Sequence, residues 1–203
     1  MPVGQKEVYY LLGENRELLE PSPHLEGFKA RGEEVLLLTE PIDEFVVQAL
    51  PEYKGKKLKA VDRGRLDEAV DEGQRKAFQG LLDFMKGRLG EVKDVRLSNR
   101  LKESAACLVA EEGTPGAHMQ ELLRRLGRGH ELPPAKKVLE VNAEHPAVAA
   151  VHKLYERDKG DPRLEKYCRL LYDEAVIAEG SKVKDPVALA RLINELLVKD
   201  ASS

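Results

Sequence analysis

The chain has 203 residues, 42% of them hydrophobic and 34% charged, with a formal net charge of -3 at pH 7. This near-neutral balance provides no broad basic field, which argues against a protein that binds nucleic acid or an anionic membrane surface. Cys107 and Cys168 are the only cysteines, and no Cys-x-x-Cys pair is present to bind zinc or to support redox chemistry. No apolar run is long enough to span a membrane, so we expect a cytoplasmic protein. From its length we expect the chain to form two small domains.

The first part of the chain has the pattern of a small parallel α/β unit. Strands are predicted at residues 7–12, 34–39 and 57–61, and helices at residues 14–31 and 41–50 between them. The first helix is interrupted by Pro-Ser-Pro at 21–23 and ends at Gly32, a residue type that commonly terminates helices. Alternating strands and helices predict a parallel sheet covered by helices, in αβα order.

From about residue 64 the pattern changes to a long charged helix that stops at Gly90. Short strands then follow at residues 92–97, 106–110 and 137–141, and helices occupy the rest. We therefore expect an α/β domain followed by a mixed α+β domain. The divisions are a first domain at 1–64, a connecting long helix at 65–90 and a C-terminal domain at 91–203.

Four helix starts are marked by a proline that follows a potential capping residue. They are Thr114-Pro115, His145-Pro146, Asp161-Pro162 and Asp185-Pro186. Proline suits the first helical position because its missing N–H would have no partner there, and a preceding side-chain acceptor caps the exposed amides.

The last two predicted helices each carry an apolar stripe at three- and four-residue spacing. In the first, the stripe includes Leu164, Cys168, Leu171 and Ala175; in the second, it consists of Leu189, Leu192, Ile193, Leu196 and Leu197. Two such helices joined by a short loop expose more apolar surface than they can cover themselves. Periodicity leaves two possibilities equally open: the preceding layer covers the stripes, or a second copy does so in a dimer.

Several segments of the second domain resemble one known family. They are VKDVRLSNRL (92–101), ACLV (106–109), LEVN (139–142) with His145-Pro146, LLYD (170–173) with AEG (178–180), and Asp185-Pro186 with INELL (193–197). In this order they resemble the C-terminal domain of the heat shock protein 90 family of molecular chaperones, most closely its bacterial form. The first domain resembles the end of the same family's middle domain through YY (9–10), SPHL (22–25), EVLLL (34–38), IDE (42–44) and GK (55–56). The resemblance covers essentially the whole chain.

The resemblance implies an ATP-dependent chaperone of protein folding and the stress response. In that family ATP and Mg bind in an N-terminal domain, and a catalytic arginine comes from the early middle domain. Neither part falls within this chain. We therefore expect no catalytic, cofactor-binding or metal-binding residue and no enzyme activity, in a chain that is either a fragment or a naturally shortened relative.

Two surfaces are also implied by the resemblance. The final helices of each protomer would pack with their two-fold mates as a four-helix bundle, which predicts a homodimer. Its expected interface residues are Leu171, Ala175, Leu189, Leu192, Ile193, Leu196 and Leu197. Unfolded or partly folded client proteins would contact an amphipathic helix at residues 115–126 through Met119, Leu122, Leu123 and Leu126. The competing interpretation, that this helix buries its apolar face in its own core, is about equally weighted.

Two other classes of function remain open from the sequence. Residues 1–64 could form a small α/β ligand-binding module or enzyme, with its ligand at the carboxyl edge of the sheet near Gly13 or Thr39 and the helices as a dimerisation appendage. The chain could also be a purely structural dimeriser without client affinity. No phosphate-binding loop supports the first alternative. The Gly-Lys pair at 55–56 would need a glycine five residues earlier, and Leu50 stands at that position.

Overall fold

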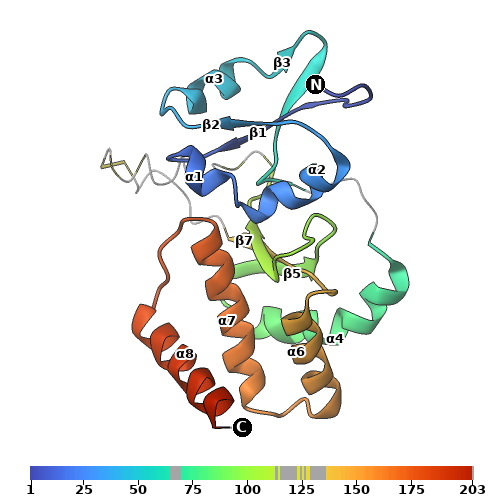
Figure 1. The fold of residues 1–203 in the computed structure, drawn as a ribbon, viewed down its shortest axis with the longest axis vertical. Helices are drawn as coiled ribbons and strands as arrows, with labels where there is room; N and C mark the ends of the chain where they lie inside the picture. The colour runs from blue at the N-terminus through green and yellow to red at the C-terminus, as the bar shows by residue number, and fades with distance from the viewer. Residues whose placement is uncertain are drawn as a thin grey trace.

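The computed structural model describes residues 1–64, 70–112, 114, 123, 125, 127–128 and 136–202. Two groups of helices and strands lie one beyond the other along the long axis, the first from the N-terminal part of the chain and the second from the rest (Figure 1). The expectation of a mixed α/β fold with two small sheets is confirmed.

The first unit is built on a four-stranded sheet in the order β2-β1-β4-β3. Its elements are β1 (Val8–Leu12), α1 (Arg16–Leu19), the short 3-10 helix η1 (Pro23–Leu25), α2 (Glu26–Arg31), β2 (Val35–Leu38), α3 (Asp43–Ala49), β3 (Glu52–Tyr53) and β4 (Lys56–Ala60). Strand β1 pairs in parallel with both β2 and β4, as predicted. Strand β3, which was not predicted, forms a hairpin with β4 across Lys54 and Gly55, both at positive φ.

Alternation along β1 divides the apolar residues of this unit between the two sheet faces. Leu11 packs with Leu19 and Phe28 on the side of α1 and α2, whereas Tyr10 and Leu12 pack on the other side, with Val47 of α3. Helices therefore cover both faces, which is the layering that parallel strands require to keep their backbone and side chains out of water.

The single interrupted helix predicted at 14–31 is three shorter elements. Asn15 caps α1 by accepting a hydrogen bond from the Leu18 N–H at 2.9 Å, and Ser22 accepts one from the His24 N–H at the start of η1. Helix α2 ends at Gly32, whose φ of 68° places it in the left-handed region that glycine adopts without strain. Prolines at 21 and 23 explain the break, since proline cannot continue a helical hydrogen-bond ladder.

The second unit combines a three-stranded sheet with longer helices. Its elements are α4 (Glu72–Arg88), β5 (Val92–Leu97), β6 (Ala106–Val109), β7 (Lys137–Val141), α6 (Pro146–Arg157), α7 (Arg163–Ala178) and α8 (Pro186–Ala201). Strand β7 lies between the other two, parallel to β5 and antiparallel to β6. All three predicted strands are confirmed.

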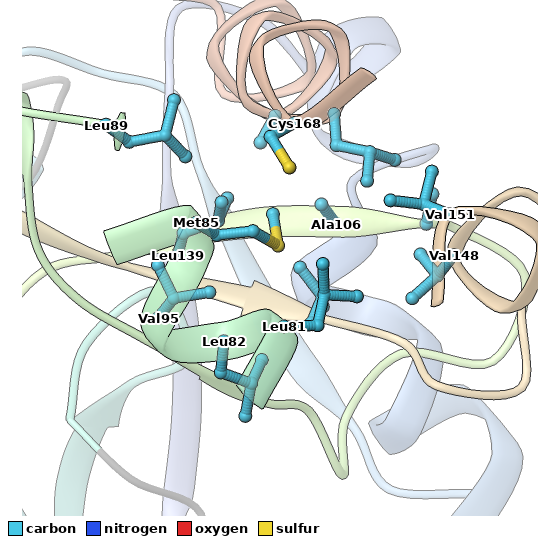
Figure 2. Close-up of a cluster of buried hydrophobic side chains, with 14 of the residues drawn as sticks. Leu81, Leu82, Met85, Leu89, Val95, Ala106, Leu139, Val148, Val151 and Cys168 are labelled. Atoms are coloured by element: carbon cyan, nitrogen blue, oxygen red, sulfur yellow. The ribbon is translucent and has the colours of Figure 1, made fainter. Parts of the chain in front are cut away.

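One large core holds this unit together (Figure 2). Leu81 and Met85 of α4 meet Leu139 of β7 and Val148 of α6, and Cys168 reaches the same core from α7. Both cysteine thiols are buried and free, and burial raises the pKa of Cys168 to about 12, so the thiol stays protonated and apolar in character. The described part of the predicted connecting helix is thus α4, packed in this core.

The helix starts follow the predicted proline positions. The ring of His145 accepts from the Ala147 N–H at 3.2 Å, and Asp185 accepts from the Ala188 N–H at 2.9 Å, each directly before the proline that opens its helix. Asp161 accepts from the Arg163 N–H, and α7 begins one residue later than predicted. The predicted start at Pro115 lies outside the described residues.

Candidate functional site

A buried arginine joins the two units. Arg100 follows β5, has no exposed surface, and its Nε donates to the Glu140 carboxylate of β7 at 2.8 Å. Its two terminal nitrogens donate to the carbonyl oxygens of Val61 and Gly64, just beyond β4 of the first unit. Arg96 adds a second guanidinium, at 2.7 Å from Glu140 and 3.1 Å from the Gly64 carbonyl. A charge buried this deeply is tolerated because nearly every polar atom has a partner.

A carboxylate from the first unit makes the reciprocal contact. Glu26 accepts hydrogen bonds from the N–H groups of Lys102, Glu103 and Ser104 at 2.6, 2.8 and 3.1 Å, and from the Ser104 hydroxyl. Partial burial alone would raise the pKa of Glu26, but these hydrogen bonds favour the charged form and lower it overall. The loop after Arg100 is therefore held by an anion that belongs to α2.

The backbones of the two units also come into direct contact at this junction. The Ala110 N–H donates to the Asp62 carbonyl at 3.0 Å, and the Gly64 N–H donates to the Ala110 carbonyl at 2.9 Å. A β-carbon added at Gly27 would lie 3.0 Å from the carbonyl oxygen of Arg100, so only glycine fits without a shift. We use the term junction for these contacts of residues 24–27 and 61–64 with 96–110 and 140.

The predicted dimer helix leaves its apolar residues uncovered. No residue of α8 is buried; Leu189, Leu192 and Leu196 are half-buried, while Ile193 is 44% and Leu197 61% exposed. Val187 and Val198 of the same helix are also exposed. In Figure 1, α8 lies at the outside of the molecule, beside α7, to which the Lys166–Glu195 ion pair connects it at 2.5 Å.

Leu171 and Ala175 occupy a different environment from the one predicted for them. They are 4% and 1% exposed and belong to the large core of the second unit, because α7 turns this stripe toward β6. Both residues are therefore covered within the single chain, and their place in a dimer interface stays a prediction.

Three of the four predicted client-contacting residues fall in a part of the chain that the structure does not describe. Met119, Leu122 and Leu126 lie outside the described residues. Leu123 is in helical conformation and is half-buried.

The outer side of α3 carries an apolar surface that sequence reasoning missed. Ile42 is 63%, Phe45 54% and Val46 45% exposed, and Tyr53 of the adjacent hairpin is 53% exposed. On the inner side Glu44 is only 1% exposed, and burial raises the pKa of its carboxyl group. The three-residue spacing of Ile42 and Phe45 could have indicated this surface.

Within the described part of the chain, no group of His, Cys, Asp and Glu side chains is close enough to hold a metal ion. None of the described helices is both long and apolar enough to cross a membrane.

The chain is an α/β unit fastened to an α+β unit, and the apolar side chains uncovered on α3 and α8 are of the kind that often mark interaction surfaces. Comparison of the sequence with known proteins identifies the family. The family model described as Hsp90 protein matches residues 1–203. The chaperone protein HtpG of Geobacter sulfurreducens is 48% identical over 100% of this chain and 33% of its own length, and that of Nocardia farcinica is 40% identical over 98% of the chain and 33% of its own length.

The chain therefore belongs to the Hsp90 family of heat-shock chaperones, which act in protein folding and the stress response. It spans about a third of the length of the curated relatives that it matches.

Proposed function

We propose that this chain is the dimerisation and client-contacting part of an ATP-dependent chaperone, and that two copies form the base of a clamp that holds partly folded proteins. The observation that carries the proposal is the uncovered apolar face of α8, in a chain that belongs to a chaperone family. Nucleotide binding and hydrolysis are assigned to a segment outside this chain, so the chain itself acts without catalytic residues or a cofactor.

The proposed dimer covers α8 with α7 and α8 of a second copy. An isologous contact of this kind brings the same residues together from both copies, so one apolar face is sufficient. The expected interface residues on α8 are Leu189, Leu192, Ile193, Leu196 and Leu197. Burying a leucine or isoleucine that is half exposed in the isolated chain stabilises the contact by about 1 kcal/mol per side chain.

Client contact is assigned to two surfaces. The outer side of α3, with Ile42, Phe45 and Val46, is exposed apolar area on the first unit, and such area binds apolar segments of other proteins without requiring a particular sequence. The second surface is the helix expected at residues 115–126, whose methionine can adapt to different partners. Clients are therefore unfolded or partly folded proteins in the cytoplasm, and nucleic acid and membranes are not partners.

Client holding tests this proposal most simply. The purified chain should suppress the aggregation of a thermally unfolding model protein without added ATP, and should show no ATP turnover above background. A variant with Ile193→Asp and Leu197→Asp changes only exposed α8 residues and should hold client less well, because a monomer presents half as many client surfaces as the dimer. Lys153→Asp, at an exposed position on α6, is the control. Sustained ATP turnover, or client aggregation that the intact chain leaves unchanged, would contradict the proposal.

A further inference from the structure

A cavity of about 370 Å³ opens between the two units, next to the junction. One wall is formed by the carboxyl end of β1, from Leu11 to Glu14, together with α1 and η1; the other is formed by residues 177–182, the end of α7 and the loop after it. The volume lies within the range of small-molecule sites. Its position outside the carboxyl end of a central parallel strand is also where α/β sheets bind ligands.

Two polar side chains in the lining are almost completely buried. His24 is 4% and Ser22 7% exposed, and His24 Nδ1 has no hydrogen-bond partner among the described residues. Burial, followed by the nearby charges of Arg100 and Lys137, lowers the pKa of His24 to about 3, so the ring is neutral at physiological pH. A buried polar nitrogen without a partner is costly, and a ligand hydroxyl or amide would satisfy it.

The uncompensated charge of the lining is positive. The carboxylates of Glu14, Asp62 and Glu179 each have a basic partner, at Arg125, Arg63 and Lys137 respectively. Lys182 lines the same cavity, is exposed, and has no ion-pair partner among the described residues. An anionic group of a ligand would therefore be favoured at Lys182.

Apolar side chains occupy the rest of the wall. Leu11 and Leu19 are buried, whereas Leu18 of α1 and Ile177 of α7 are 61% and 56% exposed while lining the same cavity. Exposed apolar side chains that line a concave site can be covered by the body of a small ligand.

From this arrangement we propose that the cavity binds a small amphipathic organic acid. Its apolar body lies against Leu19 and Ile177, its carboxylate lies near Lys182, and a hydroxyl or amide group reaches His24. Because the lining comes from both units, the ligand binds the joined arrangement better than a separated one and stabilises the junction by mass action. The site involves neither α8 nor the outer side of α3 and does not depend on the proposed dimer.

Three probes separate the contributions of the carboxylate and of the hydroxyl group to binding. They are phenylpropionate, its para-hydroxylated analogue and the uncharged phenylpropionamide. Titration of the intact chain, followed by two-dimensional amide NMR, should give saturable shifts at residues 11–14 and 177–182. The amide should bind about fivefold more weakly than the acid, and Lys182→Glu should reverse this order because it places a second carboxylate beside that of the acid. The hydroxylated acid should bind about fivefold more tightly than the plain acid, and His24→Phe should remove that gain.

Surface variants keep the test decisive even if His24→Phe does not fold. Ile177→Glu and Lys182→Glu change exposed residues and should each weaken binding of the acid, whereas Leu36→Glu, at a position that is 50% exposed and outside the cavity, should leave it unchanged. Absence of saturable binding at millimolar probe would overturn the proposal, with ordered water then satisfying His24. Binding that both cavity variants leave unaltered would overturn it as well.

Discussion

Arg100 and Glu140 form an ion pair of 2.8 Å in which both side chains are almost fully buried, and the same guanidinium donates to two carbonyl groups of the neighbouring unit. The pair therefore links the strands of the second unit to the end of the first. Removing one partner of a buried pair leaves an uncompensated charge, which costs about 3–5 kcal/mol, whereas replacing both by apolar residues costs much less.

The first prediction concerns this pair. Glu140→Gln should lower the free energy of unfolding by about 3 kcal/mol, because the charges of the buried Arg100 and the half-buried Arg96 remain without an anion. Urea denaturation followed by circular dichroism measures the change. The double variant Arg100→Leu, Glu140→Leu should recover part of the loss; a Glu140→Gln protein as stable as the parent would contradict the assigned role of the pair.

The second prediction is a loss of stability in mild acid caused by His24. The pKa of His24 is about 3 in the folded protein and 6.5 in the unfolded chain, so below pH 6.5 the unfolded chain binds a proton that the folded protein does not. This contribution to stability is present above pH 6.5 and is lost as the pH falls toward 3, by about 1.4 kcal/mol per pH unit. His24→Leu should flatten this part of the profile of unfolding free energy against pH. An identical slope in both proteins would contradict the prediction.

The third prediction concerns the close approach of α2 to Arg100. Gly27→Ala should destabilise the protein by about 1–3 kcal/mol, since the added methyl group meets the Arg100 backbone at 3.0 Å. Hydrogen exchange should accelerate at residues 102–104, whose amides donate to Glu26. Gly87→Ala is the matched control: it lies in α4 with no atom within 4 Å of its added β-carbon, and it should stabilise the protein by about 0.5–1 kcal/mol. Equal effects at the two glycines would argue against a tight contact.

The fourth prediction separates client contact from folding. Phe45→Ser on α3 removes an exposed aromatic side chain, so thermal stability should change by only about 0.5 kcal/mol. Client holding, measured as the light scattering of an aggregating model protein, should nevertheless weaken. Leu36→Ser, at a similarly exposed position on β2, serves as the control. If both variants hold client as well as the parent, the outer side of α3 is not a client surface.

All strands of the two sheets except β3 could be predicted, because short apolar runs bounded by turn residues leave few alternatives. The central strand at 137–141 even contained a sign of the junction, since a carboxylate in a strand buried on both faces must have a partner. That partner could not be identified, because Arg100 lies 40 residues earlier in the chain and only the folded topology brings the two together.

What covers the apolar stripes of α7 and α8, by contrast, could not be predicted from the sequence. Periodicity places Leu171 and Leu196 on equivalent stripes, yet the sheet covers the first and leaves the second partly exposed. What covers a stripe is a property of the tertiary arrangement. For α3 the pattern was misleading, because Glu44 is turned inward and Phe45 outward, against the usual preference of these residue types.

The central claim, that α8 joins two copies of the chain, is tested most directly by the solution mass from light scattering at several concentrations. The chain has a mass of 22.7 kDa, and the account predicts a species of twice that mass. The Ile193→Asp, Leu197→Asp variant should return to the single mass with its helicity retained. A monomer at every concentration would contradict the claim, as would a dimer that this variant leaves intact.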